Sequence, residues 1–251
     1  MRKPLFDLVS VFQVDDYLYF YEEMLTDERT AEEINRLVKL LELDKPMDIL
    51  DLACGYGRHA NRLAVLGHRV TGVDLMEGFL ELARQDAQAR SVQVRYLQSD
   101  MRQIDFQEEF DRVMLLFTAF GYFEQSENLL VLKNAARALR PGGLFVTDTM
   151  NRDVVLKDFQ PMHVTDKNGD LLVDRNSFDS RNGLWLNQRI VIRNGVRIDK
   201  PFIIRIYNPN EFEAMLAEVG LEVYGMFGGW DGQPVSTDSR RLVVLARKPA
   251  G

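Results

Sequence analysis

A glycine-containing turn is the segment of this sequence best suited to hold a ligand. It follows the short apolar run 48–53 and reads Asp51-Leu52-Ala53-Cys54-Gly55-Tyr56-Gly57-Arg58-His59-Ala60. Glycines at such a turn let the backbone pass close to a ligand at the N-terminus of the next helix. The Gly-x-Gly-x-x-Ala pattern also suits a dinucleotide, so this turn alone predicts only a nucleotide-like ligand.

Three acidic residues narrow the choice of ligand. Asp51 lies four positions before Gly55, Asp74 lies 23 positions after Asp51 at the end of a second apolar run, and Asp100 follows a third. A carboxylate repels a pyrophosphate but pairs with an ammonium group. Asp74 is placed to accept hydrogen bonds from two ribose hydroxyls. The acids therefore favour a cationic nucleoside without phosphates, such as S-adenosylmethionine (SAM), over NAD.

The residues after the second and third runs are expected to hold the adenine ring. The carboxylate of Asp100 can accept a hydrogen bond from the adenine amino group, and the backbone of Met101 can reach a ring nitrogen. Leu75 can cover the face of the ring together with Met76. The carbonyl of Phe117, which ends a fourth run, is expected to accept a hydrogen bond from the SAM ammonium group.

Strands alternating with helices are expected to position these groups. A helix is expected over 15–42, and the first apolar run and its turn are followed by a helix-like stretch over 58–66. The strand–helix alternation continues through further strands at 69–74, 92–97, 112–117 and 143–148 and helices at 77–90 and 126–139. It predicts a parallel sheet with helices on both faces, which holds ligands at the carboxyl ends of its strands.

The pattern changes after about residue 160. Asn182-Gly183 and Asn194-Gly195 separate three alternating segments, which cover residues 171–179, 184–193 and 196–207. Asn-Gly is a strong hairpin signal, so these segments predict a three-stranded antiparallel meander. A helix over 210–219 and two strands over 221–227 and 241–247 complete the chain.

The expected architecture is a single α/β domain over 1–251 with a Rossmann-like, doubly wound sheet. The sheet is mostly parallel and ends in a C-terminal antiparallel hairpin. A helical cap is expected over 1–45. A small antiparallel β insert over about 160–207 is expected to form a lid or a wall of the active site.

Composition argues against several classes of partner. The chain has 251 residues and a formal net charge of −7, whereas nucleic-acid binding needs clustered Lys and Arg. No apolar run approaches the roughly 20 residues of a membrane span, and the N-terminus lacks a signal-like apolar core. One cysteine and three histidines do not make a metal cage. We expect a cytoplasmic protein without a metal, nucleic-acid or membrane partner; its oligomeric state stays open.

Four motifs in this order resemble those of the class I SAM-dependent methyltransferases, over about residues 17–248. The resemblance implies SAM as cofactor and S-adenosylhomocysteine as product. It is closest to the glycine N-methyltransferase type, through Arg29-Thr30-Ala31-Glu32, and implies that Arg29 holds the SAM carboxylate. The motifs are Ile49 to Gly57, Val73-Asp74, Ser99-Asp100-Met101 and Leu139-Arg140-Pro141-Gly142-Gly143. The expected cofactor contacts are Tyr21, Arg29, Asp51, Ala53, Gly55, Gly57, Asp74, Leu75, Asp100, Met101 and Phe117.

The same resemblance makes Asn151, Arg205 and Tyr207 candidates for contacting the methyl acceptor. Tyr122, a few residues after the fourth strand, is expected to face the transferred methyl group. A small-molecule acceptor, methylated on nitrogen or oxygen, needs mainly positioning and exclusion of water; a hydroxyl acceptor also needs a base. The alternatives are a SAM-binding protein without transfer activity and an NAD-linked oxidoreductase.

Overall fold

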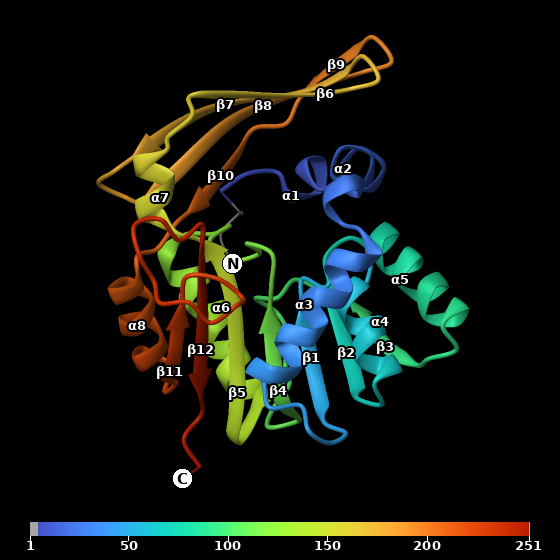
Figure 1. The fold of residues 1–251 in the computed structure, drawn as a ribbon, viewed down its shortest axis with the longest axis vertical. Helices are drawn as coiled ribbons and strands as arrows, with labels where there is room; N and C mark the ends of the chain where they lie inside the picture. The colour runs from blue at the N-terminus through green and yellow to red at the C-terminus, as the bar shows by residue number, and fades with distance from the viewer. Residues whose placement is uncertain (1–4, 251) are drawn as a thin grey trace.

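Seven strands form the central sheet of the computed structural model, which describes residues 5–250 (Figure 1). Their order is β11-β12-β5-β4-β1-β2-β3. The pairs among β1 to β5 are parallel, and β12 runs antiparallel to both β5 and β11. The predicted fold class is therefore confirmed. The strands are β1 (Asp48–Leu52), β2 (Arg69–Asp74), β3 (Val94–Gln98), β4 (Phe110–Leu115), β5 (Leu139–Met150), β11 (Glu222–Phe227) and β12 (Arg241–Arg247).

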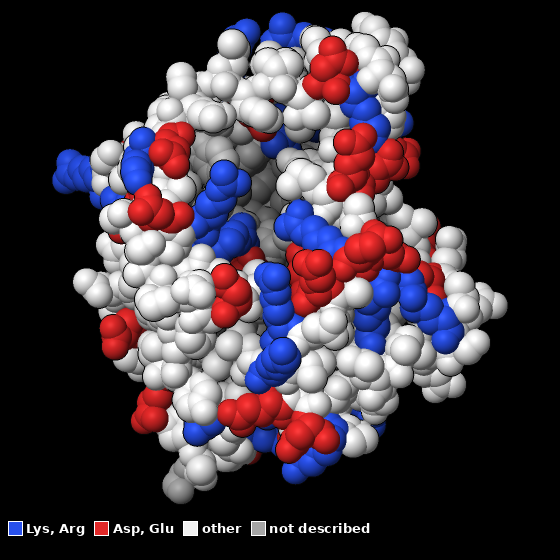
Figure 2. Space-filling view, in the orientation of Figure 1, with Lys and Arg blue, Asp and Glu red and all other residues white. Residues whose placement is uncertain are grey.

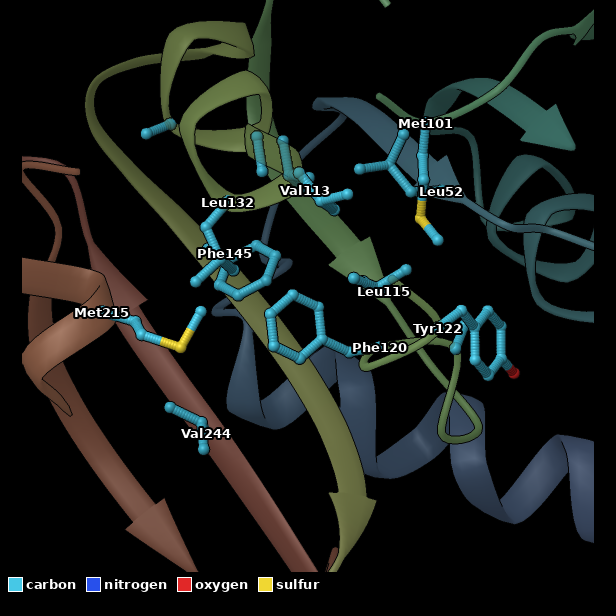
Figure 3. Close-up of a cluster of buried hydrophobic side chains, with 14 of the residues drawn as sticks. Leu52, Met101, Val113, Leu115, Phe120, Tyr122, Leu132, Phe145, Met215 and Val244 are labelled. Carbon is cyan, nitrogen blue, oxygen red and sulfur yellow. The ribbon is translucent and has the colours of Figure 1, made fainter. Parts of the chain in front are cut away.

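Helices cover both faces of this sheet because alternate residues of each strand point to opposite faces. Ile49 of β1 packs in one cluster with side chains of α3, α4 and α5, whereas Leu50 and Leu52 pack in the other with α6 and α8. Figure 3 shows part of the second cluster, where Val113, Phe145, Leu132 and Met215 meet between the sheet and α6 and α8. These helices are α3 (Asp27–Leu40), α4 (Arg58–Val65), α5 (Glu77–Ala89), α6 (Gln125–Ala138) and α8 (Pro209–Glu218).

The strand order creates a crevice at the carboxyl edge of the sheet. From β1 the chain continues to β2 on one side, and β4 pairs with β1 on the other. Successive crossovers therefore diverge at β1, which is the point where open α/β sheets bind ligands. The turn after β1 and the ends of β2, β3 and β4 all lie at this edge.

The single helix expected over 15–42 is wrong, because three shorter helical segments occupy that range, and within residues 5–250 a further one precedes them. Thr26 breaks the run: its side-chain oxygen accepts a hydrogen bond from the backbone N–H of Arg29 at 3.2 Å and so begins a new helix. Residues 1–4 of the expected cap lie outside the described residues. The segments are α1 (Leu8–Val11), α2 (Val14–Tyr21), the 3₁₀ helix η1 (Glu22–Met24) and α3.

The insert contains five strands rather than the three expected. Sequence analysis missed β6, whose hairpin with β7 turns at Asn168-Gly169, with φ values of 55° and 85°. The expected third strand is divided at Pro201, which has no N–H to donate to a ladder. After α7 (Arg152–Lys157), the strands are β6 (Met162–Lys167), β7 (Asp170–Asp179), β8 (Leu184–Arg193), β9 (Val196–Asp199) and β10 (Phe202–Arg205).

The insert lies beyond the carboxyl edge of the central sheet, next to α1 and α2 (Figure 1). Phe20 of α2 packs against Leu172 and Val191 of the insert. Within residues 5–250, no helix is both long enough and apolar enough to span a membrane.

Candidate active site

A cavity lies at the carboxyl edge of the central sheet, where the sequence predicts the ligand. Its walls come from the turn after β1, from the ends of β2, β3 and β4, and from the segment 8–25. Among the residues that the structure describes, the insert contributes none of the lining side chains. The predicted cofactor residues in the lining are Asp51, Ala53, Gly55, Asp74, Leu75, Asp100, Met101 and Phe117.

Asp51 brings an unpaired carboxylate to this cavity. Only 2% of the residue is exposed, and its Oδ2 atom has no hydrogen-bond partner within residues 5–250. Burial raises the pKa of Asp51 to about 7; the Arg58 charge opposes this rise and the Asp74 charge adds to it. A buried carboxylate without a partner is costly, and a ligand cation would satisfy it.

Asp74 connects the end of β2 to the glycine turn. Its Oδ2 atom accepts a hydrogen bond from the Gly55 backbone N–H at 2.7 Å, and its Oδ1 atom accepts one from Met76 at 2.8 Å. Burial still raises the pKa of Asp74 above its usual range. Each carboxylate oxygen accepts two hydrogen bonds, so acceptor capacity remains for a ligand hydroxyl.

The two glycines of the turn have different roles. Both have positive φ, +56° at Gly55 and +75° at Gly57. A Cβ added to Gly55 would meet no protein atom within 4 Å, whereas one added to Gly57 would lie 2.2 Å from the Tyr96 hydroxyl oxygen. Gly57 does not line the cavity and is required for packing, whereas Gly55 leaves space at the cavity wall.

Asp100 is held by an arginine that sequence analysis missed. Arg102 donates to both carboxylate oxygens of Asp100, at 3.0 Å to Oδ1 and 2.6 Å to Oδ2, and contacts Glu127 at 2.5 Å. Its guanidinium also lies 4.1 Å from the ring centroid of Phe123. These contacts fix the orientation of the Asp100 carboxylate, and Asp100 lines the cavity beside Met101.

A second group of charged residues adjoins the cavity. Arg58 pairs with Glu33, Arg29 donates to the same carboxylate at 3.0 Å, and His59 Nε2 lies 2.9 Å from it. The rings of His59 and Phe117 line both the main cavity and a smaller one beside it. Figure 2 shows Lys and Arg side chains on both sides of a hollow in this face of the molecule.

This charged group carries a net positive charge near neutral pH. Burial alone would raise the pKa of Glu33, but the hydrogen bond from His59 and the charge of Arg58 lower it to about 2. Burial and the Arg58 charge lower the pKa of His59, so its ring is neutral. The two arginines therefore face one carboxylate. The sequence motifs point to Arg29 but not to Glu33 or Arg58, although Arg58 directly follows the glycine turn.

Comparisons with known proteins agree with this geometry. Residues 49–143 match a family described as "Methyltransferase domain". "Putative methyltransferase YqeM" from Bacillus subtilis is 30% identical over 207 residues, which cover 80% of this chain and 83% of that protein. The chain belongs to the class I SAM-dependent methyltransferases. The comparisons do not support the dinucleotide alternative.

Other relatives of this methyltransferase carry more specific names. Cypemycin N-terminal methyltransferase from Streptomyces is 28% identical over 84% of this chain and 89% of its own length. Glycine N-methyltransferase from Rattus norvegicus is 33% identical over 52% of this chain and 50% of its own length.

Solved structures show the same fold. The CcbJ methyltransferase from Streptomyces caelestis has a TM-score of 0.76 and 23% identity, covering 87% of this chain and 94% of that one. SAM-bound CalS10, an amino pentose methyltransferase from Micromonospora echinaspora, has a TM-score of 0.66 and 22% identity, covering 94% and 97%.

The cavity of this methyltransferase fits SAM, its cofactor. The Asp51 oxygen without a partner can pair with the ammonium group of SAM. Arg29 and Arg58, which line the smaller cavity, can pair with its carboxylate. Asp74 can accept further hydrogen bonds from its ribose hydroxyls. Apolar side chains of Leu75 and Met101 line the same cavity and suit a flat aromatic base. When bound, SAM supplies an electrophilic methyl group on a sulfonium.

Tyr207 and Arg205 do not lie at the cavity of the methyltransferase. Tyr207 is 1% exposed, and its hydroxyl accepts a hydrogen bond from Asn128 at 3.0 Å and donates one to Gln125 at 2.9 Å. Arg205 lies beside the Tyr207 ring and 3.7 Å from Glu211. Their prediction as acceptor contacts has no support in this geometry, because both serve the packing between the insert and α6 and α8.

Asn151 and Tyr21 also lie outside the cavity lining. Asn151 begins α7, where its side-chain oxygen accepts the Asp153 N–H at 3.1 Å and its amide donates to the Ser236 carbonyl at 2.8 Å. Tyr21 stacks on Tyr17 with ring centroids 4.8 Å apart, and Tyr17 rather than Tyr21 lines the cavity. Of the predicted acceptor residues, Tyr122 alone lines it.

Proposed function

We propose that this methyltransferase transfers the SAM methyl group to a small-molecule acceptor, with an amine favoured over a hydroxyl. The proposal rests mainly on the aromatic side chains in the wall of the cavity. Tyr17 and Phe12 from the N-terminal segment and Tyr122 from the β4–α6 connection form part of its wall. A cavity lined by apolar and aromatic side chains with a few charged groups suits a small ligand.

The cofactor roles follow from where the charged groups lie. Asp51 would pair with the SAM ammonium group, and Arg29 and Arg58 would face its carboxylate. Asp74 would accept hydrogen bonds from the ribose hydroxyls. Asp100 and the Met101 backbone would hold the adenine ring, as the sequence predicts.

The hydroxyl groups of Tyr17 and Tyr122 support the preference for an amine as the methyl acceptor. Burial raises the pKa values of Tyr17 and Tyr122 far above neutrality, so both hydroxyls keep their protons. They can orient an acceptor but do not accept its proton. A neutral amine presents its own lone pair, whereas a hydroxyl needs a base. Two relatives, cypemycin N-terminal methyltransferase and glycine N-methyltransferase, are named for methylation of nitrogen, whereas the ubiquinone biosynthesis O-methyltransferases, which match over a shorter part of this chain, are named for methylation of oxygen.

The insert would support the wall of the cavity by holding α2 in place. Lys200 is 2% exposed and donates to Asp16 of α2 at 2.6 Å and to Gln13 at 2.9 Å. Arg193 contacts the same Asp16 carboxylate at 3.0 Å. Asp16 thus ties the insert to the helix that carries Tyr17, although no insert side chain among the described residues lines the cavity.

The proposal is tested by turnover with labelled SAM against matched sets of small amines and alcohols, with S-adenosylhomocysteine as the detected product. We expect methylation of one or more amines. Methylation of alcohols alone would contradict the preference for nitrogen. Tight S-adenosylhomocysteine binding without turnover of any acceptor would favour the SAM-binding alternative.

A further inference from the structure

Two consecutive residues after β4 adopt a backbone conformation that side chains disfavour. Phe117 has φ of 59° and Thr118 has φ of 60°, and neither is glycine. The left-handed region brings Cβ close to the backbone, and it is least favourable for a β-branched residue such as Thr118. Such outliers persist only where the surrounding structure imposes them, and they cluster at functional sites.

Asp148 of β5 imposes this conformation. Its Oδ1 atom accepts a hydrogen bond from the Phe117 N–H at 2.6 Å, and its backbone oxygen accepts one from the Thr118 N–H at 3.0 Å. One residue therefore satisfies both successive N–H groups of the turn. The Asp148 side chain is 4% exposed.

Arg241 of β12 completes the support. Its guanidinium pairs with the other oxygen of Asp148 and donates to the Thr118 hydroxyl oxygen at 2.9 Å. Residues of β5 and β12, which are paired at Asp148 and Val243, thus hold the turn from two sides. The sheet therefore holds the turn partly through the Thr118 side chain, whose hydroxyl oxygen Arg241 contacts.

The Phe117–Thr118 turn forms part of the cavity surface that would contact the amino-acid end of a ligand. Phe117 lines both the main cavity and the smaller adjoining one. The guanidinium of Arg58 lies 5.2 Å from the Phe117 ring centroid, and that of Arg29 lies 5.7 Å from it. A change of backbone at this turn would therefore move the Phe117 carbonyl and the surface that supports both arginines.

We propose that Asp148 and Arg241 are positioning residues, which hold the strained Phe117–Thr118 turn so that it receives the amino-acid end of SAM. This rests on the proposed placement of that end between Asp51 and the arginines. Neither residue lines the main cavity within residues 5–250, but both line the smaller cavity beside Arg29 and Arg58. Direct contact with the ligand carboxylate is therefore the alternative that the test must separate from positioning through the turn.

The test compares two ligands by calorimetry. S-adenosylhomocysteine carries the amino-acid end, and 5′-methylthioadenosine lacks it. Asp148→Asn keeps the side-chain shape but removes the anionic acceptor, and Arg241→Met keeps the stem but removes the charge. We expect each change to weaken S-adenosylhomocysteine about tenfold, the usual effect of losing a hydrogen bond of this kind, and methylthioadenosine less than about twofold.

Thr118→Gly separates positioning from direct contact. Glycine accepts this φ without strain, so the variant keeps Asp148 and Arg241 but loosens the turn and removes the Thr118 hydroxyl. We expect a higher melting temperature and weaker S-adenosylhomocysteine binding. Ser91→Gly is the matched control, because Ser91 has φ of 56° after α5 and does not line the cavity. It should raise the melting temperature without changing either affinity.

Three results would contradict these assignments. If the Asp148 and Arg241 variants lose affinity for both ligands by the same factor, the two residues only stabilise the fold. That result would overturn the proposal. Unchanged S-adenosylhomocysteine binding in Thr118→Gly would overturn it too, because direct contact would then explain the other variants. Absence of S-adenosylhomocysteine binding by the parent protein would instead refute the assignment of the cavity.

Discussion

Replacing Asp51 by asparagine should stabilise the empty protein and weaken cofactor binding. The carboxyl group has an ordinary pKa of 3.8 and a pKa of about 7 in the fold, because it is buried without a partner. Between these values the folded state binds the proton and the unfolded state does not, so the free energy of unfolding falls as pH rises from about 4 to 7. The shift corresponds to about 4 kcal/mol at 1.36 kcal/mol per pKa unit.

Asp51→Asn removes this ionisation, so its free energy of unfolding should not fall in that pH window. Above pH 7 the variant should be more stable than the parent by up to about 4 kcal/mol, less the cost of an unsatisfied amide. Urea unfolding of both proteins at about pH 5 and pH 8 measures the difference. Equal pH dependence in the two proteins would refute the raised pKa.

Ligand binding gives the second readout. The ammonium group of S-adenosylhomocysteine should pair with ionised Asp51, so below pH 7 binding must first displace the proton. The affinity should then fall by as much as about tenfold per pH unit below 7, with proton release. Calorimetry in two buffers of different ionisation enthalpy counts those protons. An equally steep acid limb in Asp51→Asn would show that another group binds the ammonium.

Three further changes test the other roles. Asp74→Ala should weaken S-adenosylhomocysteine by about 2–4 kcal/mol, because two charged hydrogen bonds are lost; equal calorimetric affinity would overturn the ribose assignment. Gly57→Ala should cost several kcal/mol of stability in thermal unfolding, because its Cβ would clash with Tyr96, whereas Gly55→Ala should cost about 1 kcal/mol and chiefly reduce affinity. Tyr207→Phe should lose about 1 kcal/mol of stability and leave kcat/KM unchanged; a large loss of turnover would return it to the active site.

The central sheet could be predicted because its signals are local. The central parallel strands are short apolar runs, and β1 and β4 are buried on both faces, whereas the edge strand β3 is more polar and partly exposed. The insert was harder, since β6 is an edge strand whose exposed residues give little periodicity. The break at Thr26 was missed because the helical pattern continues on both sides of its cap.

Several of the predicted cofactor residues line the cavity, whereas the position of Tyr207 could not be predicted from the sequence. Asp51 and Asp74 lie at the carboxyl ends of β1 and β2, and Gly55 lies in the turn after β1, so topology alone brings them to one edge of the sheet. Tyr207 is instead placed by a hydrogen bond to Asn128, 79 positions earlier. No local pattern reports such a pairing, and a resemblance in motif does not fix where the side chain points.

The two sides of the amino-acid pocket are complementary to a zwitterion. Glu33, faced by Arg29 and Arg58, keeps a pKa of about 2 and stays ionised, yet it neutralises only one of the two arginines. Burial raises the pKa of Asp51 to about 7, and its Oδ2 atom has no hydrogen-bond partner in the described structure. One side thus carries excess positive charge while the other requires a cation. A ligand with both charges complements both sides, and one that lacks the cation leaves the buried Asp51 carboxylate unpaired.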